Sequence, residues 1–146
     1  MKPIFLLLLS AIVFCGCSKS TSSSSHWTYG GNSFTGTSTI LVDSSLNSSG
    51  SSGNYILNIK YSETPVAGVY TVIFALDTPA SKECTITAGF NLFTPGGMTY
   101  YSLSGGSVTV TSDDGKIAAS FNNIQMTSIF DTTMSYGSLS GILIQQ

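Results

Sequence analysis

Apolar and polar residues alternate along most of the chain beyond residue 26. In residues 55–61, Tyr, Leu, Ile and Tyr occupy every second position, and Val108 and Val110 alternate with serine and threonine. A period of two is typical of a β-strand with one buried face, because successive side chains point to opposite sides. Residues 69–76 instead form a nearly continuous apolar run, which predicts a strand buried on both faces.

Two glycine-containing turns and one shift in the alternation add local detail. Residues 30–32 (Gly-Gly-Asn) and 113–115 (Asp-Asp-Gly) each predict a hairpin turn, because these residue types tolerate positive φ. Beyond Phe121 the buried positions move by one residue, to Ile124. This change predicts a β-bulge at Asn122-Asn123.

The number and spacing of these segments define the fold class. Residues 138–144 close the chain with a further strand, whereas residues 43–54 are predicted to form a loop rich in Ser, Gly and Asn. No segment beyond residue 26 has the 3.6-residue period of an amphipathic helix. We expect an all-β domain, an antiparallel sandwich or closed barrel of about eight to nine strands. The pattern alone does not distinguish a sandwich from a barrel.

The N-terminal segment has a different pattern. Lys2 precedes residues 4–14, which are apolar except for Ser10. A membrane-spanning helix needs roughly 20 apolar residues, so this run is too short to cross a bilayer. A short positive start followed by an apolar run is typical of a secretory signal peptide, and we expect a signal helix that is cleaved after export.

The residues Phe14-Cys15-Gly16-Cys17 end this segment. They resemble the lipobox of bacterial lipoproteins, in which Leu, a small residue and Gly or Ala precede an acylated Cys. The resemblance implies that Cys17 receives the lipid and becomes the new N-terminus. Cys15 is rejected as the acylated residue, because bulky Phe14 would then occupy a small-residue position. Soluble secretion with cleavage near Ser20 is the alternative, although no Ala-x-Ala site supports it.

The lipoprotein resemblance divides the chain into three parts. Residues 1–16 are the signal peptide, residues 17–25 a Ser-rich flexible tether, and residues 26–146 a single β-domain. Because one acyl chain alone binds a membrane only reversibly, the two or three chains implied by the resemblance would give stable anchoring. We therefore expect a cell-envelope protein attached to the membrane through its N-terminal lipid. In a Gram-negative host, Ser18 lacks the aspartate of the enterobacterial inner-membrane retention pattern, which favours the outer membrane.

Composition agrees with export and excludes one class of partner. Only 8% of the residues are charged, against about 25% in an average domain. The five cationic residues are all lysines, and the formal net charge is −2. Nucleic acid is excluded as a partner, because its binding requires clustered Lys and Arg to displace counterions.

Reactive side chains are few, and they do not form a recognisable catalytic set. Cys84 would be the only thiol left after removal of Cys15 and acylation of Cys17, so the mature chain can form no internal disulfide. Cys84 lies on the apolar face of a predicted strand and is interpreted as a small buried hydrophobe. The single histidine, His26, has no Gly-x-Ser-x-Gly turn or metal-ligand cluster to act with. We predict a protein without catalytic residues, metal or cofactor.

Aromatic residues are the remaining candidates for a binding site. Trp27, Tyr29 and Phe34 cluster in the first predicted hairpin, and Tyr100 and Tyr101 follow a Pro-Gly-Gly turn. An exposed Tyr or Trp can stack on a sugar or anchor a partner protein, whereas ordinary core packing is the alternative role. Adjacent Tyr100 and Tyr101 must point to opposite faces, so at most one belongs to the core.

These observations lead to three functional hypotheses for the β-domain, of which the third, an enzyme, would require a nucleophile, a base and an orienting group within hydrogen-bond reach. The first is a noncatalytic envelope lipoprotein that binds or assembles with another envelope protein. The alternative is a lipocalin-like carrier of a small apolar ligand or a glycan. A pocket of several hundred Å³ lined by apolar residues would favour the carrier.

Overall fold

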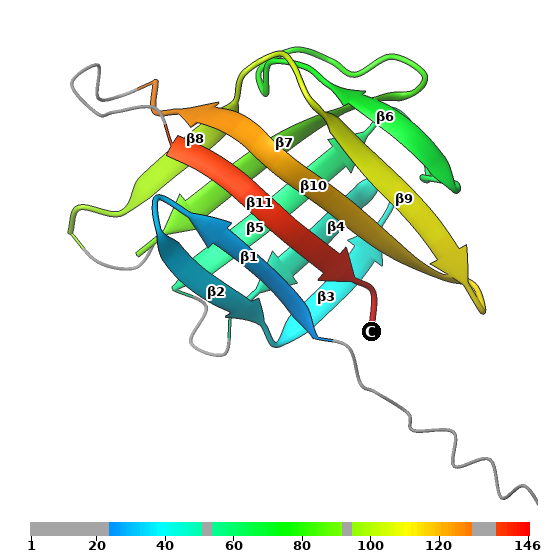
Figure 1. Cartoon of the computed structure of the whole chain (residues 1–146), viewed down its shortest axis with the longest axis horizontal. Coiled ribbons are helices and arrows are strands. Elements are labelled where there is room, and N and C mark those ends of the chain that lie inside the picture. The colour runs from blue at the N-terminus through cyan, green and yellow to red at the C-terminus, as the bar shows by residue number, and fades with distance from the viewer. Residues whose placement is uncertain (1–23, 51–53, 92–94, 130–136) are drawn as a thin grey trace, which may run out of the picture.

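The computed structural model describes residues 24–50, 54–91, 95–129 and 137–146. The regular structure in these ranges consists of strands (Figure 1), and no described segment is a helix that is long and apolar enough to cross a bilayer. The strands are β1 (Ser25–Tyr29), β2 (Asn32–Gly36), β3 (Ser38–Val42), β4 (Ser45–Ser49), β5 (Tyr55–Tyr61), β6 (Gly68–Val72), β7 (Glu83–Phe90), β8 (Met98–Ser102), β9 (Ser107–Asp113), β10 (Lys116–Thr127) and β11 (Gly137–Ile144).

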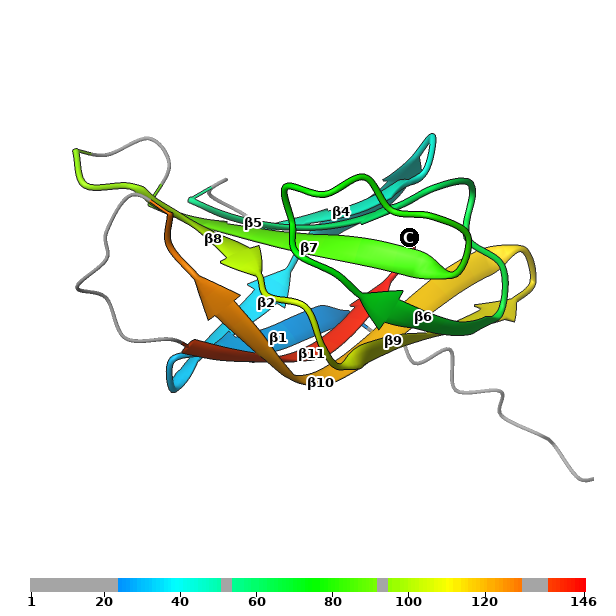
Figure 2. The ribbon, with the colours of Figure 1, turned by 90° about the horizontal axis from the view of Figure 1, so that it is seen from above.

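Five of these strands close into a barrel. Strand β10 pairs with β9, β9 with β6, β6 with β7, β7 with β8, and β8 again with β10. Three further strands, β11, β1 and β2, extend the sheet from β10, and three others, β5, β4 and β3, extend it from β7. The two extensions face each other as two layers (Figure 2).

The all-β prediction is therefore confirmed, with two differences in detail. The described chain has eleven strands instead of about eight to nine, and the β6–β7 pair is parallel in an otherwise antiparallel sheet. A parallel pair needs a crossover connection, which residues 73–82 supply between β6 and β7.

The chain crosses from one layer to the other between β2 and β3. Strand β2 ends at Gly36 and β3 begins at Ser38, although the two strands lie at opposite ends of the sheet order. A side chain at Gly36 would overlap the hydroxyl of Ser48 and approach the Trp27 ring to 3.1 Å. Glycine at this position therefore allows the two layers to come together at the crossover.

The local turn and bulge predictions are confirmed. The first hairpin pairs Tyr29 with Asn32, and the later hairpin pairs Asp113 with Lys116. The later turn contains Asp114 and Gly115 with φ values of 48° and 77°, which is the positive-φ geometry of a two-residue hairpin. The bulge lies between Phe121 and Ile124.

The predicted loop at residues 43–54 is wrong for its middle part, which forms β4. Leu46 and Ser48 both point inward and are fully buried. The Ser48 hydroxyl lies 2.8 Å from the Thr39 hydroxyl, and the Asn58 amide donates to Asn47 at 2.7 Å. Polar side chains thus satisfy one another across neighbouring strands, and a strand forms without the apolar alternation that would have revealed it.

The predicted two-faced burial of residues 69–76 is also wrong. Strand β6 ends at Val72, and its side chains alternate between the two faces of the barrel. Tyr70 and Val72 are buried, whereas Val69 is 60% exposed and Leu76, beyond the strand, is 59% exposed. Because apolar residues also occupy outward-facing positions, the sequence pattern of this strand resembles that of a strand buried on both faces.

The core lies between the layers and inside the barrel. It includes Cys84, which is a free and fully buried thiol, as the sequence predicts. Burial raises the pKa of Cys84 from its usual value of 9.0 to about 12, so the thiol stays protonated and acts as a small apolar group.

Alternate side chains of β1 point into the interior, with Ser25 at one end of the strand and Tyr29 at the other. Ser25, which the sequence placed in the tether, is a buried strand residue whose hydroxyl lies 2.6 Å from that of Thr39. Ser25, Thr39 and Ser48 form what we call the hydroxyl cluster. The Ile144 N–H also donates to the Ser25 hydroxyl at 2.8 Å, so buried hydrogen bonds link β1, β3, β4 and β11 at this end of the interior. The other end of β1 carries Tyr29, which faces a pocket.

Candidate functional site

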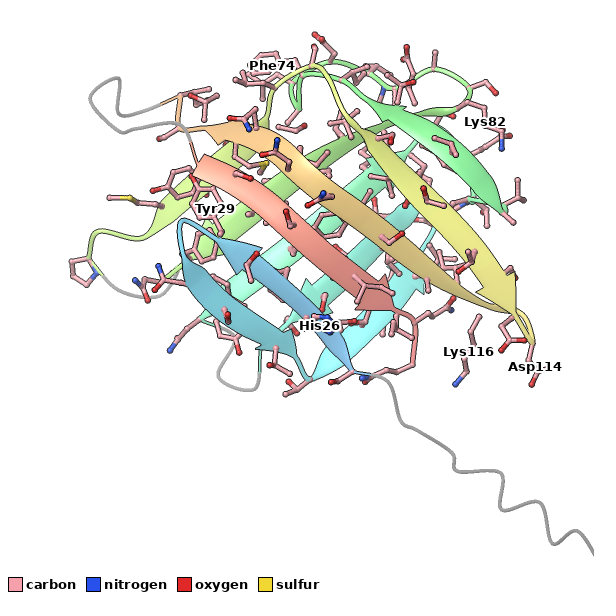
Figure 3. All side chains as sticks on the ribbon, in the orientation of Figure 1. His26, Tyr29, Phe74, Lys82, Asp114 and Lys116 are labelled. Carbon is pink, nitrogen blue, oxygen red and sulfur yellow. The ribbon has the colours of Figure 1, made fainter. Side chains whose placement is uncertain are left out.

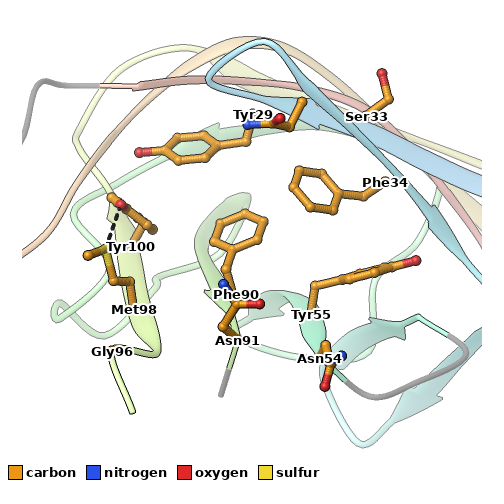
Figure 4. A pocket seen from close by; sticks show the side chains of 11 residues that line it. Tyr29, Ser33, Phe34, Asn54, Tyr55, Phe90, Asn91, Gly96, Met98 and Tyr100 are labelled. Atoms are coloured by element: carbon orange, nitrogen blue, oxygen red, sulfur yellow. Dashed lines mark hydrogen bonds between the residues drawn. The ribbon is translucent and has the colours of Figure 1, made fainter. Parts of the chain in front are cut away.

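An open pocket of about 540 Å³ lies between the layers at the Tyr29 end of β1 (Figure 4). Its volume is within the range of roughly 300–1,000 Å³ that small-molecule sites occupy. Residues from strands β1, β2, β5, β7 and β8 or their flanking turns line it: Tyr29, Asn32, Ser33, Phe34, Asn54, Tyr55, Phe90, Asn91, Gly96, Met98 and Tyr100.

Aromatic rings from both layers meet in this pocket. The rings of Tyr29 and Phe90 stack with centroids 5.4 Å apart, and the ring of Phe34 lies 4.8 Å from Phe90 and 5.2 Å from Tyr55. Figure 4 shows Tyr29 and Phe34 on one side and Phe90 and Tyr55 on the other. Because offset and edge contacts between rings are favourable, the four side chains support one another as a continuous aromatic surface.

Strand β8 contributes Met98 and Tyr100 to the lining of the same pocket. The Tyr100 ring lies 4.7 Å from the Tyr29 ring, and its hydroxyl donates to the Met98 sulfur at 3.2 Å. Methionine is flexible and polarisable, so this wall can adapt its shape to a bound molecule.

Two glycines set the positions of two pocket rings. A side chain at Gly137 would overlap the far end of the Tyr29 ring, and one at Gly50 would overlap the Tyr55 ring. The Tyr55 hydroxyl also donates to the Thr35 carbonyl at 3.0 Å, which joins β5 to β2 at the pocket. The absence of a side chain at each glycine therefore leaves the space that the tyrosine ring occupies.

The rim of the pocket is polar. Asn32, Ser33, Asn54 and Asn91 are exposed residues that supply amide and hydroxyl groups. The Asn91 N–H donates to the Asn54 carbonyl at 2.6 Å, which fixes the two segments beside each other. An asparagine amide offers both donors and acceptors, so this rim can pair with hydroxyl groups of either role.

The pocket is electrically neutral. None of its described lining residues has a formally charged side chain. Burial, and secondarily the nearby Tyr100, raises the pKa of Tyr29 to about 12, so its phenol remains a neutral hydrogen-bond donor at physiological pH. A charged ligand would lose its hydration without gaining an ionic partner here.

The five aromatic residues singled out from the sequence occupy different places. Tyr29, Phe34 and Tyr100 line the pocket, whereas Trp27 is 1% exposed and lies behind it against Phe34 and Tyr55. Tyr101 points to the opposite face of β8 from Tyr100, as adjacent strand residues must. Tyr100 is the buried member of that pair.

Sequence reasoning missed two aromatic residues of the pocket, namely Tyr55 and Phe90. Each lies at an alternation position that also fits ordinary core packing. Their common feature in the sequence is their place at or near strand ends beside Gly- or Asn-containing turns. That feature indicates where a strand ends, but it does not predict which strand ends lie together.

The remaining candidate residues lie elsewhere. Cys17, the predicted lipid attachment site, is outside the described residues, as is Cys15. His26 is exposed on the outer face of β1, where its Nδ1 lies 3.3 Å from the Ser24 carbonyl oxygen. In the described ranges, no three His, Cys, Asp or Glu side chains gather in a way that could hold a metal ion.

Comparisons with known proteins give no relative from which a function could be transferred: no family model, curated protein or solved structure matches the chain significantly.

Proposed function

We propose that this chain is an exported, lipid-tethered binding protein whose pocket holds a small uncharged ligand. One observation carries the binding part of the proposal: five aromatic rings from five different strands surround a single open pocket of about 540 Å³. Pockets lined by apolar and aromatic side chains, with polar groups placed to orient the ligand, are typical of small-molecule sites. This arrangement favours the carrier hypothesis over a surface that only binds another protein.

The tethering part of the proposal is supported by sequence. The short apolar run and the Phe14-Cys15-Gly16-Cys17 motif resemble a lipoprotein signal, and the serine-rich residues that follow can act as a tether. Such a protein would keep its binding domain at the envelope membrane through the lipid on Cys17.

Ligand binding is tested with N-phenyl-1-naphthylamine, an uncharged fluorescent probe, added to the purified full chain. We expect saturable fluorescence enhancement, and a dissociation constant at least tenfold higher for Phe90→Leu and Tyr55→Leu. Both substitutions keep an apolar side chain, so far-UV circular dichroism should show a folded protein. Val69→Ala, at an exposed position on β6, is the control and should bind as the wild type does. Equal affinity in all four proteins would refute the pocket as the binding site.

Tethering is tested by palmitate labelling in bacterial cells. The wild type and Cys15→Ala should incorporate label, whereas Cys17→Ala should not. Continued labelling of Cys17→Ala would overturn the assignment of the lipid to this residue.

A further inference from the structure

The pocket presents two chemically different surfaces to a ligand. The aromatic rings supply flat apolar faces, and the exposed Asn32, Ser33 and Asn54 supply uncharged donors and acceptors at the rim. A wholly apolar ligand would cover these polar groups without pairing them, which costs binding free energy. A ligand that fits both surfaces has an apolar face and a hydroxylated edge.

A pyranose ring has this combination. One face of the ring carries several C–H groups, while the hydroxyl groups point outward around the edge. The face of an aromatic ring is the negative part of its quadrupole and attracts the slightly positive hydrogens of such C–H groups. Asparagine amides can donate to and accept from neighbouring sugar hydroxyls at once.

The pocket and the hydroxyl cluster lie at opposite ends of β1. The described chain enters the domain at Ser25, whereas the pocket lies at the Tyr29 end of β1. His26 and Tyr29 mark these two ends in Figure 3. The buried hydroxyl cluster occupies the Ser25 end, so the pocket lies at the end of β1 away from the residue where the proposed tether would join.

We propose that the pocket binds one ring of a neutral glycan, with the sugar face against the aromatic rings and its hydroxyls paired with Asn32 and Asn54. This inference rests on the proposed function, because it names the ligand class of the same pocket. The aromatic rings pack against one another and give the sugar face one continuous surface to lie on, and the open side of the pocket leaves room for the rest of a chain of sugars. Asn54 is held in place by its backbone hydrogen bond with Asn91.

The test uses an array of neutral glycans and, in solution, methyl glycosides followed by saturation-transfer difference NMR. With the full chain, we expect at least one glycoside to show transfer concentrated on the C–H groups of one ring face. Asn32→Leu and Asn54→Leu should raise its dissociation constant at least tenfold while N-phenyl-1-naphthylamine still binds. Gln125→Leu, an amide on β10 outside the pocket lining, is the matched control and should leave glycoside binding unchanged.

The outcomes separate this inference from the proposed function. If the fluorescent probe binds at the pocket and no neutral glycan does, the glycan inference fails and the small-ligand function stands. If a glycan binds with equal affinity to wild type, Asn32→Leu and Asn54→Leu, the proposed contacts are wrong. If neither probe nor glycan binds, both proposals fail.

Discussion

The Tyr29 and Phe90 rings stack across the interior, with centroids 5.4 Å apart and planes inclined by 15°. Tyr29 belongs to β1 and Phe90 to β7, two strands that are not hydrogen-bonded neighbours in the sheet. The contact therefore joins the two layers at the pocket. A site built in this way is formed only when both extensions of the barrel are in place.

This contact should appear as an energetic coupling between the two residues. Stacked aromatic pairs contribute about 0.5–1.5 kcal/mol beyond the apolar area that they bury. We expect the variant with both Tyr29→Leu and Phe90→Leu to lose less unfolding free energy than the sum of the losses in the two single variants. The difference should be about 0.5–1.5 kcal/mol. Urea unfolding of the wild type, both single variants and the double variant measures the coupling. Tyr29→Leu combined with Val110→Ala on β9, outside the aromatic cluster, should be additive within about 0.5 kcal/mol; additivity of Tyr29 and Phe90 would contradict the contact.

The hydroxyl cluster at the other end of β1 gives a second prediction. Thr39→Val keeps the shape of the side chain but leaves the buried hydroxyls of Ser25 and Ser48 without this partner. The expected loss is about 1–3 kcal/mol of unfolding free energy. Thr109→Val, the same substitution at an exposed position on β9, is the control and should change stability by less than about 0.5 kcal/mol. A loss no larger than that of the control would show that the hydroxyl cluster does not stabilise the fold.

Two glycines of β11 provide a matched pair of substitutions. At Gly141 a new Cβ would lie 2.6 Å from the Trp27 Cα, so Gly141→Ala must push the backbones of β11 and β1 apart. At Gly137 the atoms in the way belong to the far end of the Tyr29 ring, which can move. We expect Gly141→Ala to cost about 1–3 kcal/mol, and Gly137→Ala to cost less while changing the affinity for N-phenyl-1-naphthylamine. Equal stability losses in the two variants, measured by urea unfolding, would contradict this difference.

Local features of the fold were predictable because their causes are local. The turn at Asp114 and Gly115 needs two residues that accept positive φ, and the bulge at Asn123 appears in the sequence as a shift of parity. Strand β4 was not predictable in this way. Its burial depends on the hydrogen bond between Ser48 and Thr39 on β3 and on the one that Asn47 accepts from Asn58 on β5, and these partners are not neighbours in the sequence.

The pocket was predictable only in part, for a related reason. Tyr29 and Tyr100 stood out as aromatic residues beside turns, but their partner Phe90 has the sequence pattern of a core residue. The closure of the barrel determines which strand ends lie together. That closure includes a parallel pair between β6 and β7. The residues of the site could therefore be named individually, while their common pocket follows from long-range pairing.

The buried thiol of Cys84 leads to a prediction about alkaline stability. Burial raises its pKa from 9.0 to about 12 in the folded protein. Below pH 9 the thiol is protonated in both the folded and unfolded chains, so its contribution to stability is fully present. As the pH rises from 9 towards 12, the unfolded chain loses this proton first, and the unfolding free energy should fall by up to about 1.4 kcal/mol per pH unit.

Urea unfolding between pH 8 and pH 10 tests this sign, because the fully buried Tyr61 and the half-buried Tyr29, whose pKa values burial also raises, add their own losses only above the usual tyrosine pKa of 10.0. The chain used carries Cys15→Ser and Cys17→Ser, so Cys84 is the only thiol. Adding Cys84→Ala should lower stability at pH 8, because a buried side chain becomes smaller, but it should flatten the decline between pH 9 and pH 10. In the same parent chain, Cys84 should react with a disulfide reagent at pH 8 only after unfolding, since a protonated, buried thiol is a poor nucleophile. Rapid reaction in the folded state, or an unchanged pH slope in Cys84→Ala, would show that the thiol is not held protonated by burial.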